Sequence, residues 1–206
     1  MKIVIIILAF LLFPFSAISQ QKWVLESDIC NFNAISEQRL KYLENEVGTM
    51  EIGNNRGARV DEYNDSALGY KKGRGAPYCQ SVATWAWLKS GYLPYPRTAL
   101  ANAPYNYARR EGKRVSYKPV IGDEIKWKYP GSWKGHTETI IKVLENGFVI
   151  TVAGNVTGKS LTNDPVGGGV KLMRRGIYQR IGKMVINGLV GFKASQVRAV
   201  VSSSGS

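Results

Sequence analysis

Apolar residues after position 35 first recur at the spacing of an α-helix. Leu40, Leu43 and Val47 lie three or four positions apart, which places them on one helical face. Ser36 is suited to a helix N-terminus, and Gly48 ends the pattern. The spacing therefore predicts an amphipathic helix from Ser36 to Gly48.

A second helical stretch is apolar on all sides. Residues 78–90 are dense in apolar and small side chains, with Pro77 just before them and Gly91 just after. Proline is tolerated at a helix start, and glycine is favoured just past a helix end. We expect a buried helix here and shorter helical segments over 60–63 and 101–111.

Past residue 118 the pattern changes to the alternation typical of β-strands. A turn at 119–123 leads into the first strand, Glu145-Asn146-Gly147 is a favourable hairpin turn, and 155–169 is a long loop. Helices followed by an antiparallel sheet define an α+β fold class. The expected strands are 124–127, 136–144, 148–153, 170–174 and 189–192.

The N-terminus has the three zones of a secretory signal peptide. Lys2 gives a short positive region, residues 3–15 are apolar, and small residues follow up to Ser19. The apolar run is shorter than the about 20 residues that a membrane-spanning helix needs. We expect a signal peptide over 1–19, cleaved after Ser19 or Gln20, and an uncleaved anchor stays open as the alternative.

The remaining chain is long enough for one domain with a substantial core. We expect an N-terminal segment over 20–34, a single domain over 35–194 and a flexible tail over 195–206. No other stretch is apolar enough to cross a bilayer, so no membrane span is expected in the mature chain. The expected location is therefore secreted or periplasmic.

The chain is strongly basic, with 28 Lys and Arg against 15 Asp and Glu and a formal net charge of +13. A basic exported protein is attracted to polyanions such as anionic wall polymers or lipid headgroups. Nucleic acid is not expected as a partner, because the protein leaves the cytoplasm and carries no zinc-finger or RNP-type signature. The alternative, that the charge mainly favours solubility, stays open.

Cys79 and His136 are the residues with the chemistry of a nucleophile and its base. Cys79 falls at the predicted start of the helix over 78–90, where free N–H groups stabilise a thiolate. His136 is the only histidine in the chain, and it opens an alternating strand after a Gly-rich loop. Any Cys/His mechanism therefore has one available base.

A third residue is needed to accept the second N–H of the imidazole. A hairpin that turns at 145–147 brings the start of one strand beside the end of the next. Asn155 is therefore expected near His136, and the alternative is that Asn155 is a loop residue. No cofactor and no metal are expected, because one histidine and two distant cysteines form no ligand cluster.

Several segments, in this order, resemble motifs of the CHAP domains, which belong to the NlpC-type group of papain-like cell-wall hydrolases. The resemblance extends over 35–192. Residues 75–91 are similar to the family's cysteine helix, and residues 122–125 are similar to the strand before the histidine. Residues 135–141 are similar to the histidine strand, and residues 153–155 are similar to a polar Glu-Gly-Asn site.

The resemblance implies a papain-like core of N-terminal helices packed on an antiparallel sheet. It implies Cys79 as nucleophile, His136 as base and Asn155 as the orienting residue. The implied reaction is hydrolysis of amide bonds in peptidoglycan stem peptides, by an amidase or endopeptidase that forms a thioester. Ala153 stands where the family often has an acidic residue, and Glu138, next in phase along the strand, is a substitute partner for His136.

Further residues are expected around the cysteine. The backbone N–H of Cys79 is one oxyanion donor, and Tyr78 or Asn55 supplies the second, a choice that stays open. Trp133 and Tyr129, like Tyr78, line either the substrate site or the core.

Two other functions stay open. One is a wall-binding module without catalysis on the same fold. The other is a basic binding protein with a disulfide between Cys30 and Cys79, which export would permit. Besides peptidoglycan and anionic wall polymers, an inhibitor protein is a candidate partner.

Overall fold

The computed structural model describes residues 26–113 and 115–192, and the expected signal peptide and tail lie outside them. The helices of this part are α1 (Glu26–Asn45), α2 (Ala58–Leu68), α3 (Cys79–Lys89) and α4 (Ala103–Arg110). The strands are β1 (Val115–Ser116), β2 (Glu124–Lys128), β3 (Gly135–Val143), β4 (Phe148–Val156), β5 (Gly169–Gly176) and β6 (Val185–Val190).

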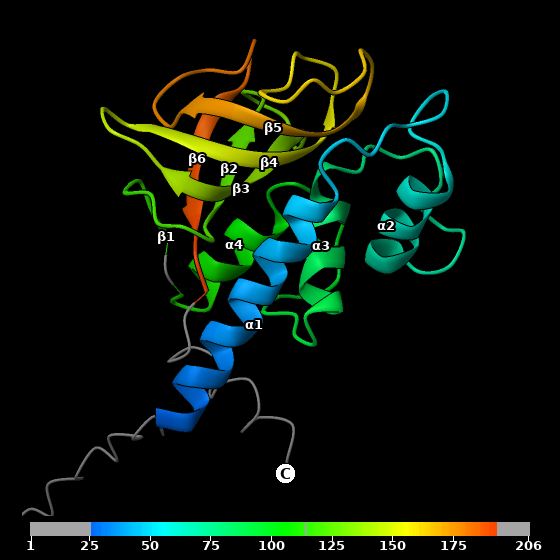
Figure 1. Ribbon diagram of the computed structural model, residues 1–206. Helices are drawn as coiled ribbons and strands as arrows, with labels where there is room; N and C mark the ends of the chain where they lie inside the picture. The colour runs from blue at the N-terminus through cyan, green and yellow to red at the C-terminus, as the bar shows by residue number, and fades with distance from the viewer. Residues whose placement is uncertain (1–25, 114, 193–206) are drawn as a thin grey trace, which may run out of the picture.

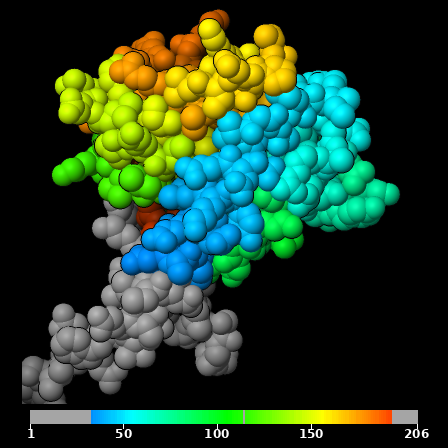
Figure 2. All heavy atoms as spheres, in the orientation of Figure 1, coloured from blue at the N-terminus to red at the C-terminus, as the bar shows by residue number. Residues whose placement is uncertain are grey.

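The helices and the strands form two layers (Figure 1). The strands make one antiparallel sheet in the order β1-β6-β2-β3-β4-β5. α3 lies against β3 and β4, α1 and α2 pack on α3, and α4 contacts β1 and β6. Figure 2 shows α1 along the front of the molecule. The fold class is therefore α+β, as the hydrophobic pattern predicts.

The first two helices are longer than the pattern predicts. α1 begins at Glu26 rather than Ser36, and the expected helical turn at 60–63 is part of the full helix α2. Residues 26–35 contain neither glycine nor proline, so nothing in the backbone stops the helix from extending toward the N-terminus. No helix within 26–113 or 115–192 combines the length and the apolar character needed to cross a membrane.

The helix α3 is buried on nearly every side, as its apolar composition predicts. Val82 and Trp85 of α3 share a core cluster with Leu43 of α1 and Val152 of β4. Gly154 lets the first turn of α3 approach β4, because a Cβ at this position would lie 2.7 Å from a methyl group of Val82. The core therefore fixes the start of α3 against the sheet.

The sheet is buried on both faces, and the face toward the helices carries charge. Glu124 on β2 is 1% exposed and accepts hydrogen bonds from Arg39 of α1 at 3.1 Å and from Lys126 at 2.7 Å. Trp87 and Tyr95 donate to the same carboxylate at 3.0 and 3.2 Å. Such partners are required, because an unpaired charge in a protein core is costly.

Lys126 extends this network to the residues beside Cys79 and His136. Its ammonium donates to Gln80 of α3 and to the Thr137 hydroxyl of β3, each at 2.7 Å. Gln80 follows Cys79 in the chain, and Thr137 follows His136. The buried network therefore joins the two elements on which these side chains lie.

The β3–β4 hairpin has the turn that its sequence predicts, with positive φ at Asn146 and Gly147. The paired positions run from Val143↔Val149 to Thr139↔Val152, with an irregularity between Ile140 and Lys142. Before Thr139, β3 continues to pair with β2 on its other side, where Trp127 lies opposite His136. The two hairpin strands are therefore no longer paired at the level of His136.

Candidate active site

Cys79 is the first residue of α3, and its side chain is buried. The thiol is free, which excludes the disulfide to Cys30 that the sequence left open. The His136 ring and the backbone N–H of Thr137 both stabilise the Cys79 thiolate and lower the pKa of the thiol. The Thr137 N–H is available because the β3–β4 pairing ends at Thr139.

The imidazole of His136 lies between Cys79 and Glu138. Nε2 is 3.1 Å from Oε1 of Glu138. Since this nitrogen faces the carboxylate, Nδ1 is the nitrogen left to face the Cys79 sulfur. His136 and Glu138 are two residues apart on one strand, so their side chains share a face of the sheet.

The Glu138 carboxylate is itself held by two further side chains. Arg175 of β5 donates from Nη2 at 2.8 Å and from Nε at 2.9 and 3.1 Å. The hydroxyl of Thr151 on β4 donates to the other carboxylate oxygen. Three strands thus fix the orientation of Glu138, and Glu138 fixes the orientation of the ring.

The electrostatic interactions among Cys79, His136 and Glu138 favour the charged form of each side chain. Burial opposes ionisation of Cys79, but the hydrogen bond and charge of His136, the Thr137 N–H and the charge of Lys126 outweigh it, so the pKa of the thiol lies below its usual value. Burial also lowers the pKa of His136, yet Cys79 and Glu138 raise it to about 9. The two shifts have opposite directions, and both favour the thiolate–imidazolium pair over the neutral pair.

The Glu138 carboxyl completes this set as an anion. Burial raises its pKa, but the hydrogen bond and charge of His136 together with Arg175 bring the pKa down to about 2. The carboxylate therefore stays charged at every pH at which the protein would be assayed. An anion at this position stabilises the imidazolium.

Asn155 does not occupy the place beside the ring that the hairpin predicts for it. Both ring nitrogens have partners, Cys79 and Glu138. Asn155 lies near the end of β4 with a positive φ of 58°. Counting outward from the turn assumes continuous pairing, and the pairing ends at Thr139↔Val152. The structure thus gives the orienting position to Glu138.

The other residues expected around the cysteine lie in different surroundings. The Tyr78 side chain is fully buried and stacks on Tyr63, so it belongs to the core. The Asn55 amide donates to the carbonyl of Gly75 and ties two loops together. Trp133 is 73% exposed and Tyr129 is also exposed. The Asn55 amide is therefore engaged, whereas the buried Tyr78 hydroxyl has no hydrogen-bond partner among the described residues.

Alkylation of Cys79 is expected to be fast near neutral pH. Iodoacetamide reacts with the thiolate, and this form persists until the pH falls through the lowered pKa of Cys79. The measurement is the rate of alkylation as a function of pH in Cys30→Ser protein, in which Cys79 is the single remaining cysteine. In a His136→Gln variant, the rate near neutral pH is expected to fall, because burial then raises the pKa unopposed by the imidazolium. A profile with the midpoint of an ordinary cysteine, about 8.5, would contradict the ion pair.

Comparison with known proteins gives distant structural similarity alone. No family model and no curated protein matches the chain. Among solved structures, the chain is similar to Rv1477, described as a hypothetical invasion protein of Mycobacterium tuberculosis, with 16% identity and a TM-score of 0.45. It is also similar to two mutated forms of the Resuscitation Promoting Factor Interacting protein RipA, with 15% and 14% identity and TM-scores of 0.46.

The extent of these matches is the same in all three cases. Each covers 80% of this chain and 65% of the solved chain, so this chain spans less than two thirds of each neighbour.

Proposed function

We propose that this protein is a cysteine-dependent hydrolase with a papain-like core that cleaves amide bonds in peptidoglycan stem peptides. The observation that carries the reaction type is the His136–Glu138 hydrogen bond next to Cys79, whose thiol pKa His136 lowers and whose sulfur lies at the first residue of a buried helix. The substrate class comes from the resemblance of 75–91 and 135–141 to CHAP motifs. No metal or cofactor takes part in this proposal.

The proposed reaction begins with attack of the Cys79 thiolate on the amide carbonyl carbon. A C–S bond forms, and the carbonyl electrons move onto oxygen, where the backbone N–H of Cys79 stabilises the charge. When the carbonyl re-forms, the C–N bond breaks and the His136 imidazolium gives its proton to the leaving amine. Glu138 holds the ring in place throughout.

Hydrolysis of the thioester then restores the enzyme. Neutral His136 takes a proton from water as the water oxygen attacks the thioester carbon. The C–S bond breaks, the acid product leaves, and the thiolate–imidazolium pair forms again.

The proposed setting is outside the cytoplasm. The signal-peptide pattern over 1–19 supports export to the periplasm or the medium. The net charge of +13 would concentrate the enzyme near anionic wall polymers. Both features fit a substrate in the cell wall.

Digestion of purified peptidoglycan by wild-type and Cys79→Ala protein tests the proposal. We expect wild-type protein to release soluble muropeptides, identified by mass spectrometry with their new amine termini, and the variant to release no more than buffer. Thermal unfolding of both proteins controls for loss of fold. Equal release by the two proteins would remove Cys79 from the mechanism, and binding without release by both would favour a wall-binding module.

A further inference from the structure

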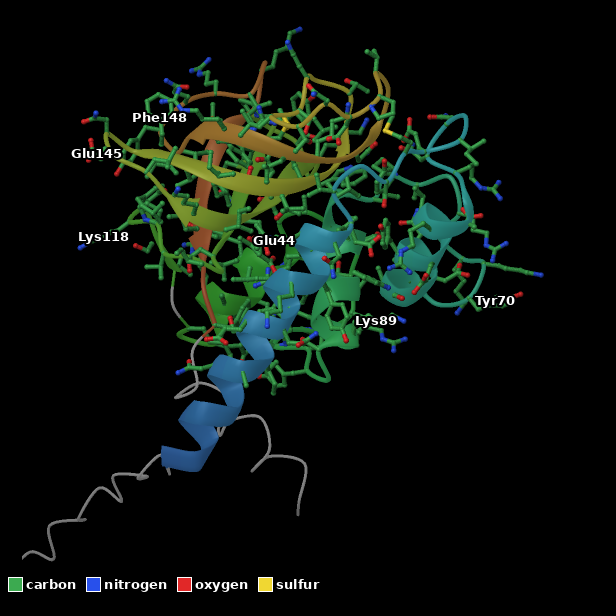
Figure 3. The ribbon with its side chains drawn as sticks, viewed as in Figure 1. Glu44, Tyr70, Lys89, Lys118, Glu145 and Phe148 are labelled. Atoms are coloured by element: carbon green, nitrogen blue, oxygen red, sulfur yellow. The ribbon has the colours of Figure 1, made fainter. Side chains whose placement is uncertain are left out.

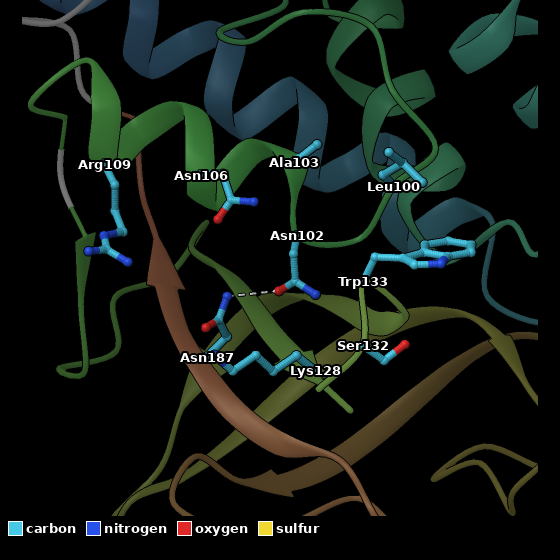
Figure 4. Close-up of a pocket in the computed structure, with 9 residues that line it drawn as sticks. All are labelled: Leu100, Asn102, Ala103, Asn106, Arg109, Lys128, Ser132, Trp133 and Asn187. Carbon is cyan, nitrogen blue, oxygen red and sulfur yellow. Dashed lines mark hydrogen bonds between the residues drawn. The ribbon is translucent and has the colours of Figure 1, made fainter. Parts of the chain in front are cut away.

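A pocket of about 490 Å³ opens beside the start of β3 (Figure 4). Its walls come from α4 and the residues before it, from the end of β2, from the loop between β2 and β3, and from β6. The side chains that matter below are Asn102, Arg109, Lys128, Trp133 and Asn187.

The pocket adjoins the residue that precedes His136. The amide of Asn102 donates to the carbonyl of Trp127 at 3.1 Å, across the strand from His136. A Cβ at Gly135 would lie 2.4 Å from that same amide nitrogen, so the Asn102 side chain rests directly on Gly135. Because neighbouring Cα atoms are about 3.8 Å apart, the wall of the pocket lies within one residue of the imidazole-bearing position.

The amides in the pocket are held in place. Asn187 donates to the Oδ1 atom of Asn102 at 3.0 Å, as the dashed line in Figure 4 marks. This bond, together with the bond from Asn102 to Trp127, fixes one wall before any ligand arrives. The exposed indole of Trp133 stands on the opposite side of the pocket mouth and offers an apolar face.

The charges of the pocket have one sign. Arg109 and Lys128 both line it, and its lining includes no aspartate or glutamate. Within residues 26–113 and 115–192, neither of these two cations forms an ion pair with a carboxylate. Arg109 lies over the Tyr105 ring, with 5.9 Å from Cζ to the ring centroid, and this contact leaves its N–H groups available to a carboxylate ligand.

We propose that this pocket binds a carboxylate of the substrate peptide on the leaving-amine side of the cleaved bond. The inference rests on the proposed function, in which His136 protonates the leaving amine, so the fragment that carries this amine departs on the His136 side. The pocket adjoins Gly135, the residue before His136. An extended peptide advances about 3.3–3.6 Å per residue, so a carboxylate within a few residues of the cleaved bond reaches Arg109 and Lys128.

Paired substrates and paired variants test the pocket. Two stem peptides are compared, one with a free carboxylate on the leaving side and one with that group as a carboxamide. We expect wild-type protein to prefer the carboxylate, and the double variant Arg109→Gln/Lys128→Gln to lose about 10- to 100-fold in kcat/KM on the carboxylate peptide alone. A matched control, Arg110→Gln/Lys142→Gln, removes the same charge from exposed positions on α4 and β3 outside the pocket lining.

Failure of the pocket and failure of the reaction give different results. If the double variant cleaves both peptides as wild type does, or loses equally on both, the pocket assignment is overturned and the hydrolase stands. If wild-type protein cleaves neither peptide, calorimetry with Cys79→Ala protein still decides. The pocket is supported if Cys79→Ala protein binds the carboxylate peptide more tightly than the carboxamide peptide and the Arg109→Gln/Lys128→Gln substitutions abolish this difference. Equal binding of the two peptides by Cys79→Ala protein overturns it.

Discussion

Replacing Glu138 by glutamine is expected to lower kcat/KM by about 10²- to 10⁴-fold, at most the loss typical of a catalytic triad whose acid becomes an amide. The amide keeps the shape of the side chain but cannot stabilise the imidazolium that must protonate the leaving amine. The pKa of His136, now about 9, is expected to fall, because one of the two groups that raise it is gone. The alkaline limb of the pH–rate profile should therefore move to lower pH.

The pH–rate profile separates this role from a purely structural one. A variant that is merely less stable would lose activity without moving the alkaline limb. Glu145→Gln is the matched control, because Glu145 lies at the tip of the β3–β4 hairpin, well away from α3 (Figure 3). An unshifted limb together with an unchanged kcat/KM in Glu138→Gln protein would show that Glu138 does not orient His136.

Glutamine at Glu124 is expected to reduce the free energy of unfolding by about 3–5 kcal/mol, the cost typical of breaking a buried ion pair. Glu124 is the carboxylate that balances two fully buried cations, Arg39 and Lys126. Without it both cations remain in the core beside a neutral amide. Urea denaturation followed by tryptophan fluorescence measures the change at neutral pH.

A double variant shows whether the loss comes from unbalanced charge. Lys126→Met removes one of the two cations, so Glu124→Gln/Lys126→Met protein should recover part of the stability lost by Glu124→Gln alone. The pKa of Glu124 lies below its usual value, since burial is outweighed by Lys126 and Arg39. Its contribution is therefore present above the usual carboxyl pKa and lost as the pH falls through the lowered value. Strictly additive effects of the two substitutions would contradict the ion-pair explanation.

Local patterns were sufficient to predict the elements that carry the site. Pro77 and Gly91 bound a run that could only be a buried helix, and this places Cys79 at its start. The alternation after Gly135 and the turn at Asn146-Gly147 define the histidine strand. These features were predictable because each depends on residues that are neighbours in the chain.

The partners of Glu138 and Glu124 were not predictable in this way. Arg175 lies 37 positions after Glu138 and reaches it only because β5 pairs with β4 in the sheet. Arg39 lies 85 positions before Glu124. The polar alternation of β2 indicates a strand, but it does not reveal that its charged face points toward the helices. Contacts set by the sheet order leave no local signal in the sequence.

The orienting residue was misplaced for a related reason. Counting from the hairpin turn treats the two strands as one continuous ladder and leads to Asn155. The irregularity after Ile140 and the end of pairing at Thr139 are properties of the assembled sheet. The i, i+2 relation of His136 and Glu138, which made Glu138 the substitute partner in the sequence, was the local signal for the residue that contacts the ring.

The pairing of β3 determines where the chain can tolerate changes in length. His136 takes its position from β2, through the Trp127↔His136 pair, and the ladder to β4 stops short of it. Residues inserted near Glu145 or Phe148, at the outer tip seen in Figure 3, would leave the imidazole where it is. One residue added between Lys128 and Gly135 could shift that register and turn the ring to the opposite side of the sheet. Chains that share this architecture should therefore vary in length at the β3–β4 turn and keep a constant length between Lys128 and Gly135.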